Sequence, residues 1–294
     1  MRDSVRPPRY PPHVPDTTAS VRPRPFLKWA GGKSRSAATL VRLAPPYTGR
    51  YWEPFMGSAA VFFELAPESA VLSDLNEELV ICFGEVARDP FAVMEQLDAM
   101  PNSRDFYLEV RRTEPKKLQP VVRAARVIYL NKTAFRGLWR VNSRGEFNVP
   151  YGEYARPYYN RDHLIGASRV LMHAEIHCKD YTHAFLNAQP GDWIYLDPPY
   201  VPDRPWGDFK RYTPGQFHED DHRKLAECMR EARGRGIYLT LTNSDTAFVR
   251  SLFEGWNITK MPTRRDIHLN SRERASHDLV ITNYEGFRQP TLPV

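Results

Sequence analysis

The apolar run Trp193–Leu196 leads directly into Asp197, Pro198, Pro199 and Tyr200, and it constrains the fold more than any other stretch of the chain. A short, uninterrupted apolar run is typical of a buried strand in a parallel sheet. Proline has no N–H to donate to a sheet, so we expect the strand to stop at Asp197. Because ligands of open α/β sheets bind beyond the carboxyl ends of the strands, the sequence predicts a binding site at this turn.

The residues of this turn have the groups needed to hold a planar exocyclic amine. The Asp197 carboxylate can accept one N–H of the amine, the Pro198 carbonyl can accept the other, and the Tyr200 ring can stack on the attached heterocycle. Two acceptors that pull both hydrogens out of the ring plane return the delocalised lone pair to the nitrogen, which makes the amine nucleophilic. The alternative is a turn that only ends a strand. The position of Asp197–Tyr200 directly after an apolar strand, together with the motifs described below, favours an active site over a simple turn.

The bulk composition is typical of a globular enzyme. With 294 residues, 41% of them hydrophobic, the chain is long enough for one large or two small domains with a real core. The sequence has no apolar run of about 18 residues that would indicate a membrane span, and no apolar segment typical of a secretory signal. The cysteines Cys82, Cys178 and Cys228 are widely spaced, which predicts buried thiols rather than disulfides or a zinc site. We therefore expect a cytoplasmic protein without a bound metal.

Positive charge is concentrated in one part of the chain. The net charge is +6, and the window 111–161 contains twelve Lys and Arg against three Glu, together with eight aromatic residues. A basic run can be an ordinary solvated face. Basic residues interleaved with aromatics suit nucleic acid better, because phosphates attract positive charge and exposed bases stack on rings.

The alternation of strand and helix patterns predicts a doubly wound α/β sheet. We expect a strand and its exit turn at 50–55, and further strands at 70–73, 174–178, 193–196, 237–242, 256–261 and 279–282. We expect helices at 57–65, 77–88, 218–233 and 245–253. Residues 1–24, rich in Pro and Arg, read as a disordered tail. Residues 25–89 and 163–294 are the predicted catalytic domain. Residues 90–162 are the predicted inserted subdomain, mostly helical and broken at prolines, with a β-hairpin at 137–154.

A cofactor site is predicted after the first two strands. Gly57 lies in the first strand-to-helix turn, where a glycine lets backbone approach a ligand closely. Asp74 ends the next strand, at the spacing where nucleotide-binding folds place a carboxylate for a ribose diol. The phosphate-binding G-x-G-x-x-G pattern is absent, which fits S-adenosylmethionine, a nucleoside cofactor without phosphates. Trp29 and Lys33 flank two glycines and could cover its methionine end; a plain loop is the alternative.

Together these stretches resemble the Dam-like DNA adenine N6-methyltransferases, the D12 class with a DPPY motif. Six stretches match in the family's order and cover nearly everything after residue 25: Phe26–Lys33, Glu53–Gly57, Asp74–Asn76, Tyr129–Asn131, Arg144–Gly152 and Asp197–Tyr200. The resemblance implies a Rossmann-like methyltransferase sheet with an inserted DNA-recognition subdomain. It also implies a site-specific enzyme that methylates adenine in duplex DNA, with GATC as a candidate target.

The resemblance further implies roles for particular residues. The implied catalytic residues are Asp197, Pro198, Pro199 and Tyr200. The implied cofactor contacts are Trp29, Ala30, Gly31, Gly32, Lys33, Glu53, Phe55, Gly57, Asp74, Asn76, Asp180, Tyr181 and Asp197. The implied DNA contacts are Lys28, Asn131, Arg136, Arg140, Asn142, Arg144 and Asn148.

The chain departs from the family's pattern at three positions. Ala59 stands where members often carry a second glycine, a change that a Cβ can tolerate. Val141 and Ser143 stand in the hairpin where an aromatic and a larger apolar residue are common. Because such hairpin positions help to intercalate and read the site, the departures leave the GATC assignment open.

The resemblance also implies a mechanism and partners. The target adenine must be flipped out of the duplex to reach Tyr200, and the activated sulfonium of S-adenosylmethionine requires neither a metal nor a covalent nucleophile. We expect a monomer that binds double-stranded DNA, does not bind membranes and has a cognate restriction endonuclease as a candidate partner. The alternatives are an RNA methyltransferase, a catalytically inactive DNA-binding relative and, least supported, a nicotinamide dehydrogenase.

Overall fold

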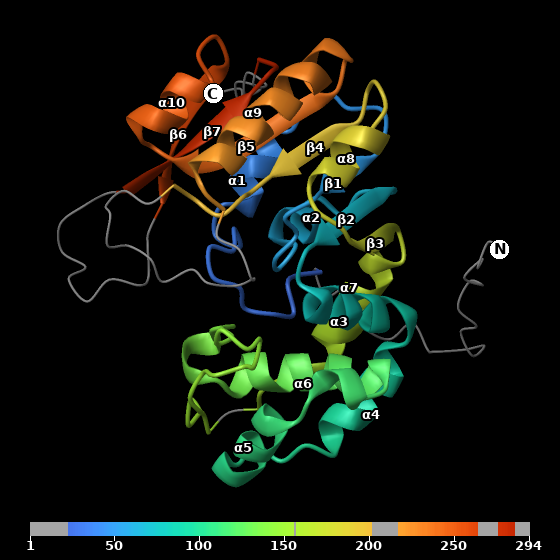
Figure 1. The fold of residues 1–294 in the computed structure, drawn as a ribbon. Coiled ribbons are helices and arrows are strands. Elements are labelled where there is room, and N and C mark those ends of the chain that lie inside the picture. The colour runs from blue at the N-terminus through green and yellow to red at the C-terminus, as the bar shows by residue number, and fades with distance from the viewer. Residues whose placement is uncertain (1–22, 156, 202–216, 264–275, 286–294) are drawn as a thin grey trace, which may run out of the picture.

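The run Trp193–Leu196 forms strand β4, which is buried along its whole length and ends at the residue before Asp197, as the two prolines require. The computed structural model describes residues 23–155, 157–201, 217–263 and 276–285. In it, β4 is the central strand of a seven-stranded sheet with the order β3-β2-β1-β4-β5-β7-β6 (Figure 1). The strands are β1 Tyr51–Glu53, β2 Ala70–Asp74, β3 Ala174–Cys178, β4 Trp193–Leu196, β5 Tyr238–Ser244, β6 Asn257–Thr263 and β7 Ser276–Thr282.

The strand order places a topological switch point in the middle of the sheet. Strands β3, β2, β1, β4 and β5 pair in parallel, whereas β7 is antiparallel to both β5 and β6. In chain order, β2 and β3 are added next to β1 toward one edge of the sheet, whereas β4 and β5 are added toward the other edge. The direction therefore reverses between β1 and β4, which is where ligands bind in folds of this kind. The expected doubly wound, Rossmann-like α/β fold is confirmed.

The two faces of the sheet are covered by separate apolar cores. Side chains alternate along a strand, so Trp193 and Tyr195 of β4 enter one core and Ile194 and Leu196 enter the other. The helices of the described residues are α1 Ala37–Arg42, α2 Ala60–Leu65, α3 Glu77–Arg88, α4 Pro90–Asp98, α5 Arg104–Arg112, α6 Pro120–Thr133, α7 Arg161–Leu171, α8 Thr182–Asn187, α9 Glu219–Gly234 and α10 Ala247–Leu252, with short 3₁₀ turns at Pro115–Lys117 and Phe135–Gly137.

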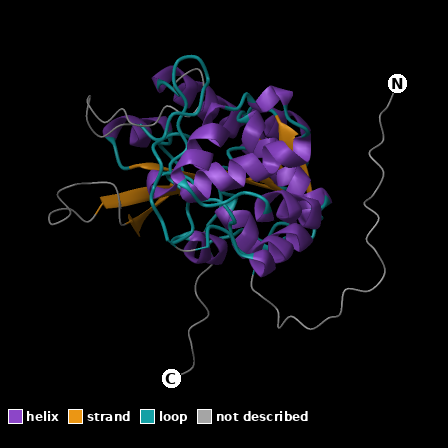
Figure 2. Cartoon of the chain, turned by 90° about the horizontal axis from the view of Figure 1, so that it is seen from below, coloured by secondary structure: helices purple, strands orange, loops and turns teal. Residues whose placement is uncertain are grey.

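Helices α4, α5 and α6 lie below the sheet in Figure 1, and the view from below shows helices in front of the strands (Figure 2). Pro90 and Pro120 each occupy the first turn of a helix, where a missing N–H does no harm. The first core continues from the sheet through α3 into α6 and on to Trp139 and Phe147. Because this core is continuous, domain boundaries at residues 90 and 162 stay a prediction.

The expected hairpin pairs over fewer residues than two regular strands would. One antiparallel bridge joins Val141 to Phe147. The flanking backbone bonds run from Asn142 N to the Glu146 oxygen at 2.9 Å and from Asn148 N to the Arg140 oxygen at 3.1 Å. The segment therefore reverses as predicted, but it pairs over too short a length to form strands.

The helix expected at 57–65 begins three residues late, at Ala60. Gly57 and Ala59 have φ values of 46° and 52°, in the left-handed region that a helix cannot include. Glycine adopts this conformation freely, whereas a residue with a Cβ is strained by roughly 1–2 kcal/mol. Ala59 is fully buried and adopts this conformation although it carries a Cβ. The departure from the family's glycine is therefore accommodated with local backbone strain.

Further expectations concern the cysteines, membrane-spanning helices and the N-terminal tail. Cys82 is buried and Cys228 half-buried, but Cys178 is exposed at the end of β3, so the expectation of three buried thiols was wrong. In the described part of the chain, no helix combines the length and the apolar character that a membrane crossing needs. Residues 1–22, most of the expected disordered tail, lie outside the described residues.

Candidate active site and nucleic-acid surface

Asp197 lies at the carboxyl end of β4, beside the switch point of the sheet. Its Oδ1 accepts a hydrogen bond from the Thr242 hydroxyl of β5 at 2.7 Å. The Lys33 ammonium lies 2.8 Å from Oδ1 and 2.9 Å from Oδ2, and it also donates to the Gly31 carbonyl at 2.9 Å. The Lys33 and Asp197 side chains are only 8% and 17% exposed, so solvent screens their attraction less than at a surface ion pair.

Tyr200 faces the same ammonium group. Lys33 Nζ lies 4.7 Å from the centroid of the Tyr200 ring, close enough for a cation–π interaction. The Tyr200 hydroxyl donates to Oδ2 of Asp278 in β7 at 2.9 Å. Burial, together with the negative charges of Asp197 and Asp278, raises the pKa of the Tyr200 hydroxyl well above its usual value, so the hydroxyl remains a donor.

Asp74 connects the end of β2 to the glycine turn. Its Oδ2 accepts from Gly57 N at 3.1 Å and its Oδ1 accepts from Asn76 N at 2.9 Å. Burial raises the pKa of the Asp74 carboxyl, and these backbone donors oppose the increase. Asn76 then caps helix α3 by accepting from Leu79 N. The carboxylate predicted to hold a ribose is thus fixed in place by the backbone around it.

Glu53, the last residue of β1, is buried beneath the site. Its Oε2 accepts from the Tyr51 hydroxyl at 2.7 Å and from Phe62 N at 3.0 Å. The pKa of this carboxyl is raised from 4.5 to about 8. Burial raises it most and nearby Asp197 adds to the increase, whereas the hydrogen bonds from Tyr51 and Phe62 and the charge of Lys33 lower it. Glu53 therefore carries a proton through most of the neutral range, and it joins β1 to helix α2.

The loop with the two glycines packs on the turn after β1. A Cβ on Gly57 would lie 2.9 Å from Cδ1 of Trp29, and a Cβ on Gly32 would lie 2.9 Å from the Trp29 carbonyl oxygen. Both distances are too short for any side chain. By contrast, a Cβ on Gly31, whose φ is 78°, would meet no atom within 4 Å. Gly31, whose carbonyl oxygen accepts from Lys33, therefore borders open space.

An aromatic group lies across the carboxyl ends of β1 and β3. The Phe55 and Tyr181 rings stack with centroids 5.5 Å apart, and Phe217 lies 5.8 Å from Phe55. Asp180 caps the turn into α8 by accepting from Thr182 N at 2.9 Å. Leu75, 61% exposed, follows Asp74 at the neighbouring strand end. These rings and the exposed leucine give a heterocycle an apolar surface to contact.

The hairpin residues expected to contact DNA differ in how free their side chains are. Asn142 Oδ1 accepts from the backbone N–H groups of Arg144 and Glu146 at 2.9 and 3.0 Å, so this amide builds the turn. Arg140 donates to the Asn148 side chain at 2.7 Å. The Arg144 side chain is exposed at the tip. A base-reading role therefore fits Arg144 best.

Asn131 corrects one expectation. It is fully buried, accepts from Lys28 N at 2.8 Å, and donates to the carbonyls of Lys28 at 2.7 Å and Gly137 at 3.3 Å. A direct contact with DNA does not fit this burial. Asn131 instead fastens the loop that begins at Lys28 to the segment that leads into the hairpin.

A second exposed group lies next to this junction. Phe135 is 45% exposed, and the Arg136 guanidinium lies 5.2 Å from its ring centroid. Arg136 has the left-handed φ of 57°, and its N–H donates to the Tyr154 hydroxyl at 2.7 Å. Lys28 Nζ lies 5.6 Å from the Tyr154 ring centroid. Two cations and two rings thus form a surface suited to phosphates and bases.

Comparison with known proteins agrees with this arrangement. Residues 29–267 match the D12 class N6 adenine-specific DNA methyltransferase family. The chain belongs to this family. It is 35% identical to the type II methyltransferase M1.LlaDCHI of Lactococcus lactis subsp. cremoris, over 89% of this chain and 95% of that protein. It is 34% identical to the type II methyltransferase M.MjaIII of Methanocaldococcus jannaschii, over 89% and 99%. It is 30% identical to the DNA adenine methylase of Escherichia coli K12, over 89% and 95%.

The chain is therefore an adenine-specific DNA methyltransferase of the D12 class. Family membership favours DNA over RNA as the substrate and decides against a dehydrogenase. The roles of individual residues stay proposals. Near the carboxyl ends of β1 to β4, the structure does bring several predicted catalytic and cofactor residues into contact: Lys33 with Asp197, Gly57 with Asp74, and Phe55 with Tyr181.

Sequence reasoning missed several residues of this methyltransferase that contact the predicted site. Thr242 and Asp278 hold Asp197 and Tyr200. Phe135 and Tyr154 surround Arg136 and Lys28. The sequence offered a signal for Phe135, because it is one of the aromatic residues in the basic window 111–161. Thr242 and Asp278 have no local signal, because their roles depend on contacts across the sheet.

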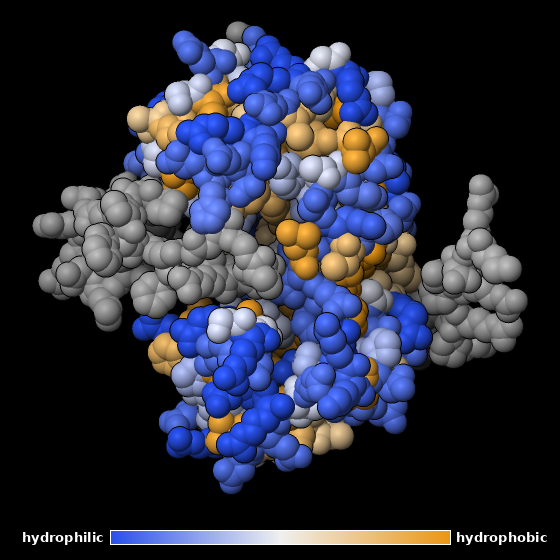
Figure 3. Space-filling view, viewed as in Figure 1, coloured by the Kyte–Doolittle hydropathy of each residue, from blue (hydrophilic) through white to orange (hydrophobic). Residues whose placement is uncertain are grey.

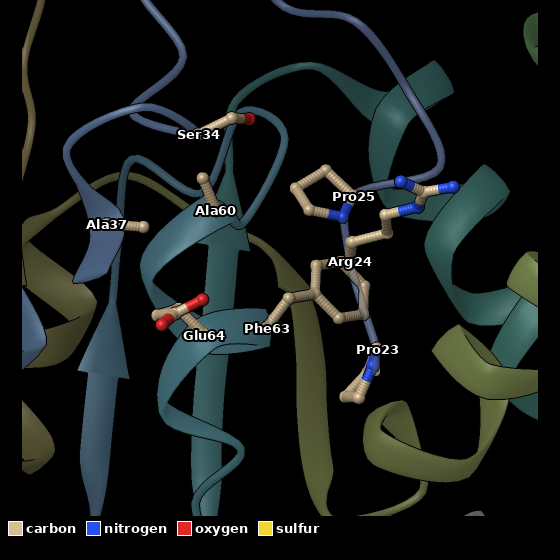
Figure 4. Close-up of a pocket in the computed structure, with 8 residues that line it drawn as sticks. All are labelled: Pro23, Arg24, Pro25, Ser34, Ala37, Ala60, Phe63 and Glu64. Carbon is tan, nitrogen blue, oxygen red and sulfur yellow. The ribbon is translucent and has the colours of Figure 1, made fainter. Parts of the chain in front are cut away.

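A separate pocket of about 220 Å³ lies beside helix α2 (Figure 4). Its lining consists of Pro23, Arg24, Pro25, Ser34, Ala37, Ala60, Phe63 and Glu64. None of these residues belongs to the predicted site, and the pocket is bordered by the first residues that the structure describes. We assign no ligand to it.

Proposed function

We propose that this methyltransferase transfers the methyl group of S-adenosylmethionine to N6 of an adenine flipped out of duplex DNA at a specific sequence. The observation that carries the proposal is the position of the Lys33 ammonium between the Asp197 carboxylate and the Tyr200 ring. Asp197 and Tyr200 already bind one nitrogen, the Lys33 ammonium, through a carboxylate and the face of an aromatic ring. A target amine needs the same two partners.

The residues around the switch point fit the cofactor. When bound, S-adenosylmethionine supplies an activated methyl group on a sulfonium. We propose that Asp74 accepts the ribose hydroxyls and that Phe55, Tyr181 and Leu75 contact the adenine ring. We further propose that the open space beside Gly31, next to Lys33, receives the methionine end. This set contains a carboxylate, apolar rings and exposed backbone, which match the three parts of the cofactor.

The chain's own groups would then orient the target amine. Asp197 accepts one N–H and the Pro198 carbonyl accepts the other, while Tyr200 stacks on the base. The incoming amine competes with Lys33 for Asp197, and Lys33 retains the Gly31 carbonyl as a partner. Asp197 need not be a strong base, because the methylated nitrogen readily loses its proton to solvent. Holding the amine in line with the methyl group supplies much of the rate.

For DNA, we propose that Arg144 reads a base edge and that Lys28, Arg136 and Arg140 contact the backbone or neighbouring bases. Exposed Phe135 can fill the gap that a flipped base leaves, since apolar side chains inserted into the stack support distorted duplexes. In Figure 3, hydrophilic residues dominate the lower part of the described surface, where Figure 1 places α5 and α6. GATC stays a candidate target. A cognate restriction endonuclease, a monomeric state and a cytoplasmic location stay proposals that the resemblance carries.

The first test is Asp197→Ala, assayed by transfer of tritiated methyl groups from S-adenosylmethionine to plasmid DNA. Loss of the group that orients the amine should lower the rate at least about 100-fold, the scale for removing one group that stabilises a transition state. DNA binding should change little, because Asp197 faces the amine rather than phosphates. Asp220→Ala, at an exposed position on α9, is the control and should retain the wild-type rate.

A rate for Asp197→Ala within about tenfold of wild type would contradict the assignment. Sequencing with modified-base detection, on DNA from cells that express the wild-type chain, would identify the methylated base and its sequence context together. Methylation at cytosine, or at adenines without a shared context, would refute the proposal of a site-specific adenine enzyme.

A further inference from the structure

A row of polar contacts connects the central strands behind the site. The Trp193 indole donates to the Thr240 hydroxyl at 2.9 Å, and the Tyr195 and Thr242 hydroxyls lie 3.1 Å apart. Thr242 then donates to Asp197. These contacts all join β4 or the turn after it to β5, on one face of the sheet. They hold the backbone from which the catalytic turn emerges.

Asp278 extends this row to β7. In the ladder it lies opposite Ser244 of β5 and Met261 of β6, so it is inside the sheet rather than at an edge. Alternation puts its side chain on the face of Val280, which shares a core with Tyr195. The residue is 5% exposed, and its Oδ2 accepts the hydrogen bond from the Tyr200 hydroxyl.

Burying a carboxylate inside the sheet costs free energy unless hydrogen-bond partners compensate for the lost water. Moving an ionised group out of water is unfavourable, and hydrogen bonds to the charged form offset that penalty. A hydroxyl that donates to a carboxylate makes one of the stronger hydrogen bonds in proteins. The bond joins residues 78 positions apart in the sequence, so it depends on the tertiary fold.

The bond constrains the ring itself. The turn fixes Tyr200 at its backbone, where Pro198 is buried and Pro199 precedes the tyrosine. Asp278 fixes the opposite end of the side chain at the hydroxyl. With both ends held, the ring can neither swing nor tilt freely. The plane of a stacking surface sets the plane of the base that rests on it, and small misplacements of a reacting group lower the rate sharply.

We propose that Asp278 is a positioning residue of methyl transfer: through the Tyr200 hydroxyl, it fixes the ring on which the target adenine stacks. This inference rests on the proposed role of Tyr200 and assigns a function to a residue outside the DPPY motif. Asp278 itself touches neither the base nor the cofactor.

The decisive experiment is a double-mutant cycle on the full chain with Asp278→Ala and Tyr200→Phe, using methyl transfer to plasmid DNA. Asp278→Ala should lower kcat about tenfold in the wild-type background and no more than about twofold in the Tyr200→Phe background. The resulting coupling, at least about fivefold, corresponds to about 1 kcal/mol or more. A purely structural role in β7 would give the same factor in both backgrounds and would overturn the inference.

A conservative variant separates anchoring from general destabilisation. Asp278→Asn retains an oxygen that can accept from the hydroxyl, so its kcat should stay within about threefold of wild type. A loss as large as that of Asp278→Ala would contradict the anchoring role. Affinity for S-adenosylhomocysteine and KM for DNA should be unchanged in both variants, because Asp278 contacts neither ligand.

The matched control is Asp192→Asn. Asp192 is also a buried aspartate, 3% exposed, but it lies before β4, where it accepts from Arg50 N and the Trp52 indole. Its replacement should lower stability without coupling to Tyr200→Phe. Tyr200→Ala distinguishes the two proposals. If it retains wild-type activity, the stacking role of Tyr200 fails; if it is inactive but the cycle is additive, only the inference about Asp278 fails.

Discussion

Glu53 and Asp197 show how two carboxyl groups in one site acquire different surroundings. Asp197 has Lys33 within 2.8 Å and a hydroxyl donor, so its charged form has strong partners. Glu53 is buried, and its pKa is raised to about 8 chiefly by that burial. Burial removes Glu53 from water and leaves it mainly neutral below pH 8. Asp197 instead has an ammonium and a hydroxyl as partners.

A pH experiment at Glu53 follows from this shift. Because the folded state raises its pKa from 4.5 to about 8, the folded protein holds this proton more tightly than the unfolded chain. The stabilising contribution is fully present below the unfolded pKa and is lost as pH rises through about 8. Glu53→Gln cannot lose a proton. The stability of the variant relative to wild type should therefore increase from pH 6 to pH 9, by at least about 1.4 kcal/mol if one pKa unit of the shift is expressed.

Urea unfolding at several pH values measures this difference. Asp245→Asn is a suitable control, because hydrogen bonds from Arg250 and Lys260 and their charges lower the pKa of the Asp245 carboxyl to about 2. Its contribution is already complete above the unfolded pKa, so the difference from wild type should stay nearly constant over the same range. A constant difference for Glu53→Gln as well would show that Glu53 does not titrate there.

The hairpin at 140–148 is an element whose form determines which residue can read DNA. The Asn142 side chain and Gly145, with φ of 79°, close the turn. Arg140 is engaged with Asn148. Arg144 is thereby presented at the tip with an exposed side chain. Short pairing, rather than long strands, makes a narrow projection that can enter a major groove.

Arg144→Ala tests whether this projection reads sequence. Arginine recognises guanine through paired donors, a contact worth about 1–3 kcal/mol, so discrimination at one base pair should fall roughly 10- to 100-fold. The measurement is kcat/KM on the preferred site and on each single-base variant. Lys116→Ala, exposed in a 3₁₀ turn outside the hairpin, should leave discrimination unchanged. Equal losses on all sequences would instead identify Arg144 as a phosphate contact.

Across the whole molecule, the cofactor loop and the DNA-reading segment are joined at one place. Asn131 bonds to the backbone of Lys28 and to Gly137. Trp29 stacks on Trp139 with centroids 6.1 Å apart. Lys33, four residues along the loop from Trp29, pairs with Asp197. The position of the recognition segment and the position of the catalytic loop are therefore set by the same contacts.

Asn131→Ala should consequently weaken two affinities at once. It leaves part-buried backbone groups of Lys28 without their Asn131 partner, a penalty of about 1–3 kcal/mol when such groups stay unsatisfied. We expect Kd to rise about fivefold or more for both S-adenosylhomocysteine, measured by calorimetry, and duplex DNA, measured by filter binding. Asn187→Ala, on the exposed end of α8, should change neither. A loss of DNA affinity with normal cofactor affinity would show that the two sites are not linked through Asn131.

The sequence alone determined the local elements and their order. Strands at 174–178 and 193–196 and the helix at 77–88 lie where they were predicted, because apolar runs, prolines and an asparagine cap act within a few residues. The doubly wound fold and the place of Asp197 follow from the same signals. The six motifs could be recognised because each is contiguous in the chain.

The tertiary structure decided which side chains meet. Thr242 and Asp278 contact the catalytic turn from 45 and 78 residues away, and no local pattern marks them. Asn131, expected at the DNA, is buried because α6 packs against the start of the catalytic loop. The late start of α2 depends on left-handed residues held by the site itself. Burial and long-range hydrogen bonds exist only once the chain is packed, and for that reason the sequence could place the site but not its supporting contacts.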